Sequence, residues 1–246
     1  MIQANQVSKW FDGVQVLHDI NATFDTGKTN LIIGQSGSGK TVFMKCLIGL
    51  LERPFTQMTA QQRKELRMEI GMLFQGSALF DNETVLGNVM FPLKMFSPMS
   101  RQEQIERAQF CIRRVGLENA DNKYPSEISG GMQKRVAIAR AIALNPKYLF
   151  CDEPNSGLDP KTSILIDELL SDITHEYGIT TVINTHDMNS VLGIGENIIF
   201  INKGHCDWTG TDKTIFRSTS GSLNDFVFAS KLFQQVKKYL ESEYAE

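Results

Sequence analysis

The sequence predicts an α/β fold with a mostly parallel central sheet, an N-terminal antiparallel β-subdomain and an inserted α-helical subdomain. Residues 29–33 and 179–183 are apolar without alternation, which is typical of strands that are covered on both faces. The first of these runs leads directly into a glycine-rich loop and then into a mostly apolar helix over residues 41–51. Residues 2–24 instead alternate in short runs, which indicates antiparallel strands. Together these patterns predict a strand–loop–helix core with smaller subdomains attached to it.

The glycine-rich loop has the pattern G-x-x-x-x-G-K-T. It consists of Gly34, Gln35, Ser36, Gly37, Ser38, Gly39, Lys40 and Thr41. Glycines let successive N–H groups turn inward, and the helix that follows directs the positive end of its dipole at the same point. In such a loop the lysine reaches the β- and γ-phosphates, and the Thr41 hydroxyl ligates the Mg²⁺ that accompanies a nucleoside triphosphate. We therefore expect a P-loop NTPase core rather than an ordinary glycine-rich turn.

Composition limits the environment and the partners of the chain. Its 246 residues, of which 41% are hydrophobic, suit one domain with an inserted lobe, so residues 1–246 are assigned to a single domain. A net charge of −3 gives no electrostatic basis for binding nucleic acid or a membrane surface. The four cysteines are far apart without a C-x-x-C pair, which argues against zinc and disulfides and fits a reducing cytoplasm. No stretch approaches the roughly 18 apolar residues of a membrane span, so a membrane role requires a partner.

The first half of the chain contains the β-subdomain and the start of the inserted lobe. The antiparallel strands end in a turn at residues 25–27, and Phe11 is expected in the loop between them. Residues 52–69 are polar and charged like a solvated helix, residues 70–74 form a short strand, and residues 77–97 are irregular and rich in Met and Phe. Ser100 and Glu103 form a capping box for a helix that Gly116 ends. We assign this helix to an inserted helical lobe over residues 77–128.

The second half supplies another glycine loop and a pair of carboxylates. The loop of Ser129, Gly130 and Gly131 opens a helix that runs to residue 144, and a glycine loop at a helix N-terminus is an anion site. The apolar strand that starts at residue 148 then delivers Asp152 and Glu153 at its carboxyl end. Ligands of parallel α/β sheets bind at that end, so these carboxylates are candidate site residues.

An amphipathic helix over residues 162–177 precedes the strands at 179–183 and 197–201, and His186 follows the first of these strands. Residues 211–246 form a C-terminal helical extension. From residue 223 this extension carries an apolar seam with alternating steps of three and four: Phe226, Ala229, Phe233, Val236 and Leu240. The seam either packs on the body of its own chain, which is favoured because exposed apolar stripes reduce solubility, or serves as a handle for another chain.

The order of these motifs resembles the nucleotide-binding subunit of an ABC transporter from Phe11 to about residue 210. The resemblance implies that Phe11 stacks on adenine, with a structural core aromatic as the alternative. It implies that Asp152 holds Mg²⁺ and that Glu153 is the general base that polarises the attacking water. Gln75 resembles the glutamine that reports on the γ-phosphate and Mg²⁺, and His186 resembles the histidine that contacts the γ-phosphate. Residues 156–159 resemble the loop that links two active sites.

In this family the second glycine loop closes on the ATP of another copy, so the resemblance implies a head-to-tail dimer of the chain. It also implies integral membrane permease subunits as partners, ATP and Mg²⁺ as cofactors, and a cytoplasmic place on the inner face of the plasma membrane. Met132 stands where the family sequence L-S-G-G-Q has glutamine. With residues 71–81 and 88–93, this methionine looks most like the ATPase of the MCE-type phospholipid transporters of Gram-negative bacteria. The narrower resemblance implies phospholipid transport, with MCE-domain and small regulatory subunits as further partners.

Three alternatives stay open beside phospholipid transport. The same subunit could serve an importer of amino acids or another small solute, or an exporter. A non-transport ATPase clamp on nucleic acid would need a basic stripe, a long coiled-coil insertion or a tandem copy, and the sequence has none of these. Loss of Glu153 or of a glycine loop would favour a nucleotide-binding scaffold without turnover, but Glu153 and both glycine loops are intact. The chain departs from the family between residues 51 and 59, where a β-hairpin is usual, so we expect a trimmed β-subdomain.

Overall fold

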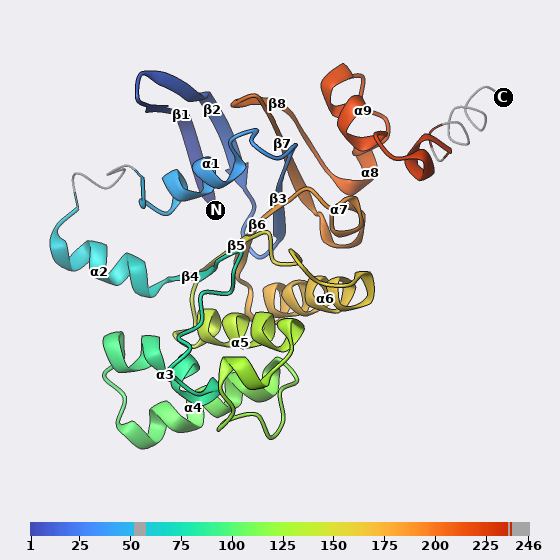
Figure 1. Ribbon diagram of the computed structural model, residues 1–246. Helices are drawn as coiled ribbons and strands as arrows, with labels where there is room; N and C mark the ends of the chain where they lie inside the picture. The colour runs from blue at the N-terminus through green and yellow to red at the C-terminus, as the bar shows by residue number, and fades with distance from the viewer. Residues whose placement is uncertain (52–57, 236, 238–246) are drawn as a thin grey trace.

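The computed structural model describes residues 1–51, 58–235 and 237, and its centre is a six-stranded sheet (Figure 1). The strands lie in the order β4-β5-β6-β3-β7-β8, and neighbours pair in parallel except β7 and β8. Their bounds are β3 Thr29–Ile33, β4 Ile70–Leu73, β5 Tyr148–Asp152, β6 Thr180–Thr185, β7 Asn197–Asn202 and β8 His205–Gly210. The mostly parallel sheet agrees with the prediction. Every second residue of β8 is exposed, so a search for continuous apolar runs does not detect this edge strand.

The N-terminal β-subdomain is an antiparallel pair of β1 (Ile2–Phe11) and β2 (Val14–Phe24). Asp12 and Gly13 form the turn between them with φ of 48° and 81°, as in the turns that match the twist of a hairpin. This tight turn places Phe11 at the end of β1, paired with Val14, so the expectation of a loop position for Phe11 is wrong. The predicted trimming near residues 52–57 concerns residues that lie outside the described part of the chain.

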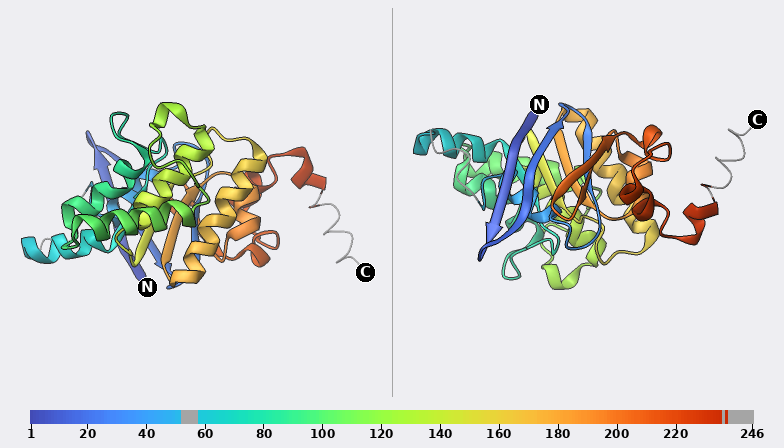
Figure 2. Two further views of the ribbon diagram at one scale, coloured as in Figure 1. Left: turned by 90° about the horizontal axis from the view of Figure 1, so that it is seen from below. Right: turned by 90° about the horizontal axis from the view of Figure 1, so that it is seen from above.

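Helices cover both faces of the central sheet (Figure 2). On one face, Phe43 and Met44 of α1 (Lys40–Leu47) pack between β2 and the sheet, in a cluster that also contains Phe24 and Phe150. On the other face, α5 (Gly130–Ile142) and α6 (Pro160–Tyr177) bury apolar side chains in a second and larger cluster. The sheet is therefore the middle layer of the molecule. Its carboxyl edge is left for the loops that carry the predicted site.

Helix α2 (Ala60–Met68) precedes β4 in the chain, and helices α4 (Arg101–Arg114) and η1 (Pro125–Glu127) follow it. The solvated helix α2 begins at a Thr59 capping box and has no buried residue, as its charged sequence predicts. Helix α4 begins at the predicted capping box of Ser100 and Glu103, and Gly116 follows it with φ of 69°. The short 3₁₀ helix η1 then leads into α5. Figure 1 shows α3 (Val85–Phe96), α4 and α5 grouped at the end of the molecule away from the β1–β2 pair.

The prediction that residues 77–97 are irregular is wrong for most of its length, because α3 spans Val85–Phe96. The Thr84 side chain caps this helix by accepting a hydrogen bond from the Gly87 N–H. Pro92 lies inside the helix, where proline normally breaks the hydrogen-bond ladder. Burial of the apolar face that contains Val89 and Leu93, against α4 and α5, offsets this loss. The bounds 77–128 for a separate lobe stay a prediction.

After the sheet, the chain forms α7 (Met188–Ile194), α8 (Asp212–Ile215) and α9 (Gly221–Val227). The prediction of one continuous seam from residue 223 is wrong, because α9 ends at Val227 and Ala229 is exposed. The buried residues of this segment are Leu223, Val227 and Phe228. Val236 and Leu240 lie outside the described residues. The described part of the tail therefore packs on its own body. None of the helices in residues 1–51, 58–235 and 237 combines the length and apolar character that a membrane crossing requires.

Candidate nucleotide site

The loop between β3 and α1 is shaped by its glycines. Gly34 and Gly39 have φ of 148° and 107°, values that residues with a side chain rarely adopt. A Cβ atom on Gly34 would lie 2.1 Å from the Ile201 carbonyl oxygen, and one on Gly39 would lie 2.9 Å from the Leu17 side chain. The backbone is thus pressed against β7 and β2, so that the loop curls over the start of α1. Both positions therefore need glycine, as the sequence motif predicts.

Polar groups inside the loop fit a phosphate group. The Ser38 Oγ atom is buried without a hydrogen-bond partner in the described structure, so it offers a hydroxyl to a ligand. Lys40 is 6% exposed, and its ammonium group donates to the Gly34 and Gln35 carbonyls at 2.8 and 3.0 Å. Burial lowers the pKa of Lys40, and Glu153 and Asp152 oppose this change. A buried ammonium that donates to neutral carbonyls favours an anion beside it.

A hydroxyl and a carboxylate meet next to the loop and fit Mg²⁺. The Thr41 hydroxyl donates to the Asp152 Oδ1 atom at 3.0 Å, and the Asn184 amide donates to the same oxygen at 3.0 Å. Mg²⁺ prefers oxygen ligands of this kind. Asn184 was not a sequence candidate, although a carboxamide inside the fully buried strand β6 is a signal that could have found it. The Asn184 hydrogen bond fixes the orientation of the Asp152 carboxylate.

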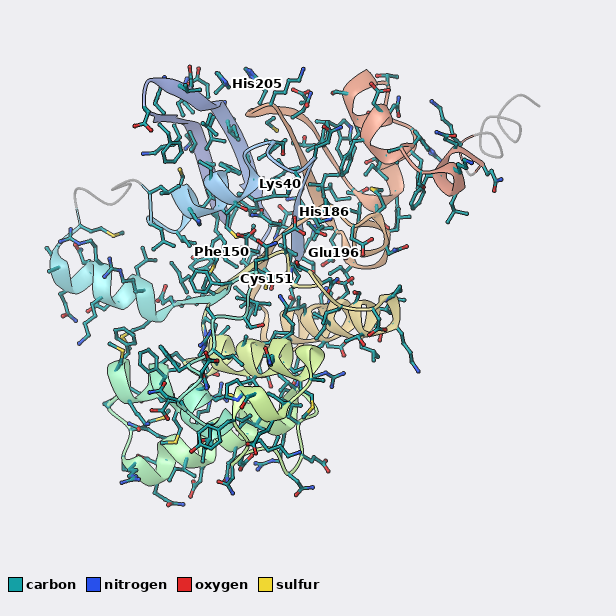
Figure 3. The ribbon with its side chains drawn as sticks, in the orientation of Figure 1. Lys40, Phe150, Cys151, His186, Glu196 and His205 are labelled. Atoms are coloured by element: carbon teal, nitrogen blue, oxygen red, sulfur yellow. The ribbon has the colours of Figure 1, made fainter. Side chains whose placement is uncertain are left out.

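Glu153 lies one residue beyond β5, in a backbone conformation that is unusual for glutamate. Its φ is 49°, and its N–H donates to the Asn184 carbonyl at 3.0 Å. Strained residues of this kind cluster at functional sites. The carboxylate lies 2.8 Å from His186 Nδ1 and 3.9 Å from Lys40 Nζ. Figure 3 shows Lys40, His186 and Cys151 in the middle of the molecule, where the ends of β3, β5 and β6 meet.

Gln75 approaches this group through the loop between β5 and α6. Its side-chain amide lies 3.5 Å from Ser156 Oγ, so it is near the site without touching Thr41 or Asp152 by a hydrogen bond in the described structure. Lys134 of α5 is buried and donates to the Gln75 carbonyl, and this burial lowers the pKa of Lys134. Lys134 was not a sequence candidate, because a lysine on a helix face usually indicates a solvated surface.

Two predicted elements do not join the group. Ser129 and Gly130 are at the start of α5, where Gly130 is exposed and Ser129 caps the helix by accepting from the Met132 N–H. No hydrogen bond in the described residues connects this glycine loop to residues 34–41. Phe11 is 41% exposed and lies under the Lys9 ammonium, 5.5 Å from the ring centre. Its exposed ring excludes the alternative of a core aromatic.

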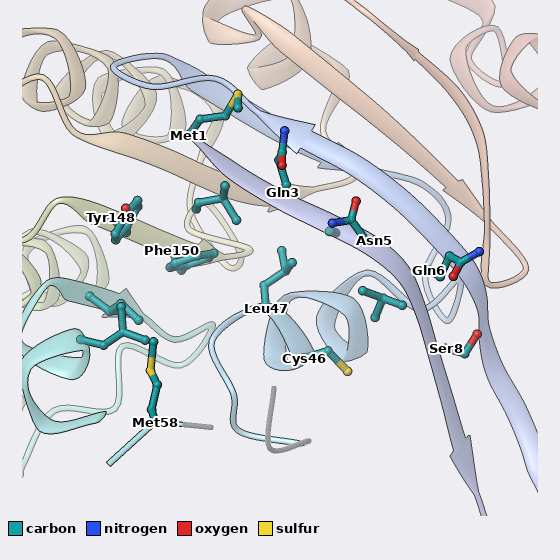
Figure 4. Close-up of a pocket in the computed structure, with 15 residues that line it drawn as sticks. Met1, Gln3, Asn5, Gln6, Ser8, Cys46, Leu47, Met58, Tyr148 and Phe150 are labelled. Atoms are coloured by element: carbon teal, nitrogen blue, oxygen red, sulfur yellow. The ribbon is translucent and has the colours of Figure 1, made fainter. Parts of the chain in front are cut away.

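The site opens into a groove, and a separate cavity lies elsewhere. The groove has a volume of about 890 Å³ and is lined by Gln35, Ser36, Glu153, His186 and residues of the tail. The cavity has a volume of about 550 Å³ and lies beneath β1, between the end of α1 and Phe150 (Figure 4). No predicted site residue lines this cavity. The groove, and not this cavity, therefore borders the candidate nucleotide site, on the side of Glu153 and His186.

Comparisons with known proteins agree with this geometry. A family model described as ABC transporter matches residues 17–156. The methionine import ATP-binding protein MetN of Campylobacter jejuni is 33% identical over 276 residues, which cover 100% of this chain and 82% of that protein. The protein of the same name from Clostridium acetobutylicum is 36% identical over 237 residues, covering 92% and 74%.

Solved structures share the fold. The dimeric structure of MJ0796, a bacterial ABC transporter cassette, has a TM-score of 0.76 at 32% identity and covers 86% of this chain and 98% of that chain. A structure of cbiO1 from Clostridium perfringens, part of the ABC transporter complex cbiONQ, has a TM-score of 0.80 at 27% identity, covering 97% and 98%. This chain belongs to the ABC transporter family. It is an ATP-binding subunit with ATPase activity, and ATP and Mg²⁺ are its cofactors.

Proposed function

We propose that Glu153 is the general base of ATP hydrolysis and that His186 orients it. The observation that carries this proposal is the 2.8 Å contact between the Glu153 carboxylate and His186 Nδ1, beside the buried Lys40. A carboxylate at this point can accept a proton from the attacking water while Lys40 and the loop N–H groups hold the phosphates. Mg²⁺ on Thr41, Asp152 and Gln75 would neutralise charge on the phosphate oxygens. Phe11, with its exposed ring, would stack on the adenine.

We propose that two copies of this chain work head to tail. Ser129 and the exposed Gly130 lie at a helix N-terminus, which suits an anion, yet within the described residues they make no hydrogen bond to the phosphate loop of their own chain. A second copy would bring these groups to the γ-phosphate. The related cassette MJ0796 has a dimeric structure, which supports this arrangement. Met132 is compatible with it, because the serine hydroxyl and the backbone N–H groups are the parts that bind phosphate.

We further propose that membrane-embedded permease subunits dock beside Gln75, at the cytoplasmic face of the membrane. Phe80 and Phe91 are each 38% exposed, and their tilted rings lie with centres 4.5 Å apart. Met95, one turn beyond Phe91 on α3, is exposed as well. An exposed apolar patch of this kind suits a helix from a partner. Leu79, beside Phe80 in the chain, is partly buried and packs against the main core cluster, so it is not counted in this surface.

For the transported substrate, we propose an amino acid or another small solute that is imported. The curated relatives are named methionine import proteins and match this chain over most of their length, which supports the importer alternative over phospholipid transport. An ATP-binding subunit does not itself contact the solute, so this step rests on relationship rather than on the geometry of the site. Phospholipid transport remains the second candidate. It is favoured by Met132 together with residues 71–81 and 88–93, and MCE-domain and small regulatory subunits belong to that candidate alone.

The catalytic proposal is tested with Glu153→Gln. This change keeps the size of the side chain and removes the base, so turnover should fall by at least about 10²-fold while ATP affinity stays nearly intact. Glu106→Gln on the exposed face of α4 is the matched control and should retain turnover. Steady-state ATP hydrolysis by Glu153→Gln within a few-fold of the parent would refute the role of Glu153.

The substrate proposal is tested separately. The complex that co-purifies with the chain from detergent-solubilised membranes is reconstituted in vesicles, and ATP-driven uptake of labelled methionine is compared with transfer of labelled phospholipid. Amino-acid uptake supports the importer. Phospholipid transfer without amino-acid uptake would replace it by the second candidate.

A further inference from the structure

A buried carboxylate of α6 connects two segments that carry the site. The first segment is the loop of residues 153–158, which contains Glu153 and Ser156. The second is the start of α7, which follows His186 directly through its cap Asp187. Neither segment is part of the parallel sheet, so the alignment of Glu153 with His186 needs support from elsewhere.

Asp167 supplies contacts to both segments. The Asn155 side-chain amide donates to Asp167 Oδ1 at 2.8 Å and also lies 3.1 Å from the Ser190 Oγ atom of α7. Ser190 in turn hydrogen-bonds Asp167. The backbone carbonyl of Asn155 accepts from the Leu158 N–H at 3.1 Å, so the same residue that Asp167 holds also closes the turn of the loop. The three side chains form one triangle between loop, α6 and α7.

The triangle of Asp167, Asn155 and Ser190 lies in the interior, where a charged carboxylate is unfavourable. Asp167 is 4% exposed and Ser190 is 1% exposed, and no cation neutralises the carboxylate in the described contacts. Burial raises the pKa of Asp167 to about 6, and the negative charges of Asp187 and Glu168 add to this change. The Asn155 Oδ1 atom is buried without a hydrogen-bond partner in the described structure. A position on the buried face of a helix would be more stable with an apolar side chain, so the carboxylate has a different purpose.

We propose that Asp167 is a positioning residue for ATP hydrolysis: through Asn155 and Ser190 it holds the loop 153–158 and the start of α7 in the one arrangement that aligns Glu153 with His186. This inference rests on the proposed roles of Glu153 and His186. Asp167 itself does not touch the phosphate loop. Its loss should therefore lower kcat and leave the KM for ATP nearly unchanged, because residues 34–41 keep their contacts.

The test compares two variants at position 167 in purified chain, with steady-state hydrolysis at saturating and limiting ATP. Asp167→Leu fills the space without an acceptor and should lower kcat by about 10-fold or more, with the KM for ATP within about 3-fold of the parent. Asp167→Asn retains an acceptor oxygen for the Asn155 amide and should restore kcat to within about 3-fold. A purely structural role would not separate kcat from KM in this way.

Asn155→Ala provides an independent route to the same result, because it cuts the triangle at a half-buried side chain and depends less on core packing. It should lower kcat as Asp167→Leu does, and the double variant should be no slower than the slower single variant, since both act on one unit. Thr174→Val is the matched control. Thr174 is a buried, hydrogen-bonded residue of the same helix near its other end, so its loss affects stability but not turnover per folded molecule.

Unchanged kcat in both Asp167→Leu and Asn155→Ala would overturn the inference, as would a loss that appears in KM instead. If Asp167→Leu does not fold, Asn155→Ala decides alone. Glu153→Gln is measured beside them: its full activity would refute the proposed function, whereas its inactivity with active Asp167→Leu and Asn155→Ala would refute the positioning role only.

Discussion

Asp167→Asn should make the chain more stable at neutral pH. The replacement has the same shape and no charge, and its oxygen can still accept from the Asn155 amide. Its new NH₂ group can donate to the Asn155 Oδ1 atom, which is buried and has no partner in the described structure. The variant also escapes the negative charges of Asp187 and Glu168, which raise the pKa of the carboxyl. Each of these changes favours the folded state.

The size of the effect follows from the pKa of Asp167. Burial raises it from the ordinary value of 3.8 to about 6, which corresponds to about 3 kcal/mol of folding free energy. Below pH 3.8 the carboxyl is protonated in both the folded and the unfolded chain, and the folded state carries no penalty. Between pH 3.8 and about 6 the unfolded chain ionises while the folded chain retains the proton, so the free energy of unfolding falls with pH, and the full penalty is present above about 6. The variant should thus gain up to about 3 kcal/mol at about pH 7.5 and almost nothing at about pH 4.

Urea unfolding, followed by circular dichroism at a series of pH values between about 4 and 8, measures this difference. The midpoints of parent and variant should nearly coincide at about pH 4, separate as the pH rises from about 4 to about 6, and stay apart by a constant amount above about pH 6. Asp172→Asn is the control, because this residue lies on the same helix and is exposed rather than enclosed. Parallel curves for parent and Asp167→Asn over the whole range would refute the argument that a buried charge at this position is unfavourable.

Three further predictions concern other parts of the molecule. Lys40→Ala should weaken ATP binding by about 10-fold or more, because it removes a buried cation from the phosphates, and titration with a fluorescent ATP analogue checks this. Phe80→Asp should abolish co-purification of membrane subunits while ATP binding persists, whereas Phe110→Asp, at an equally exposed ring on α4, should have no effect. Removing residues 223–246 should lower the thermal unfolding midpoint by several degrees or prevent folding, because Leu223 is fully buried; an unchanged midpoint would show that the tail is dispensable for the core.

Local features of the site could be predicted from sequence because each depends on neighbours in the chain. The pattern from Gly34 to Thr41 specifies a loop whose backbone only glycine tolerates, and the structure has that loop pressed against β7. Glu153 follows an apolar strand directly, so its place at the carboxyl edge of the sheet follows from strand direction alone. The helix capped by Ser100 was predictable for the same reason. Residues 85–96 were not, because Pro92 is an adverse local signal that burial of one helix face overrides.

The sequence by itself therefore determined the phosphate loop, the pair of carboxylates, the parallel sheet and the class of reaction. Only the tertiary structure decided which side chains meet across the ends of different elements. Asn184 reaches Asp152 from the neighbouring strand, and Asp167 reaches Asn155 and Ser190 from the helix that follows the loop. These contacts join residues that are far apart in the sequence, so they depend on how strands and helices pack, which local sequence patterns do not specify. Burial adds a second effect that sequence does not show, because a buried carboxylate such as that of Asp167 is less stable in its charged form than one in water.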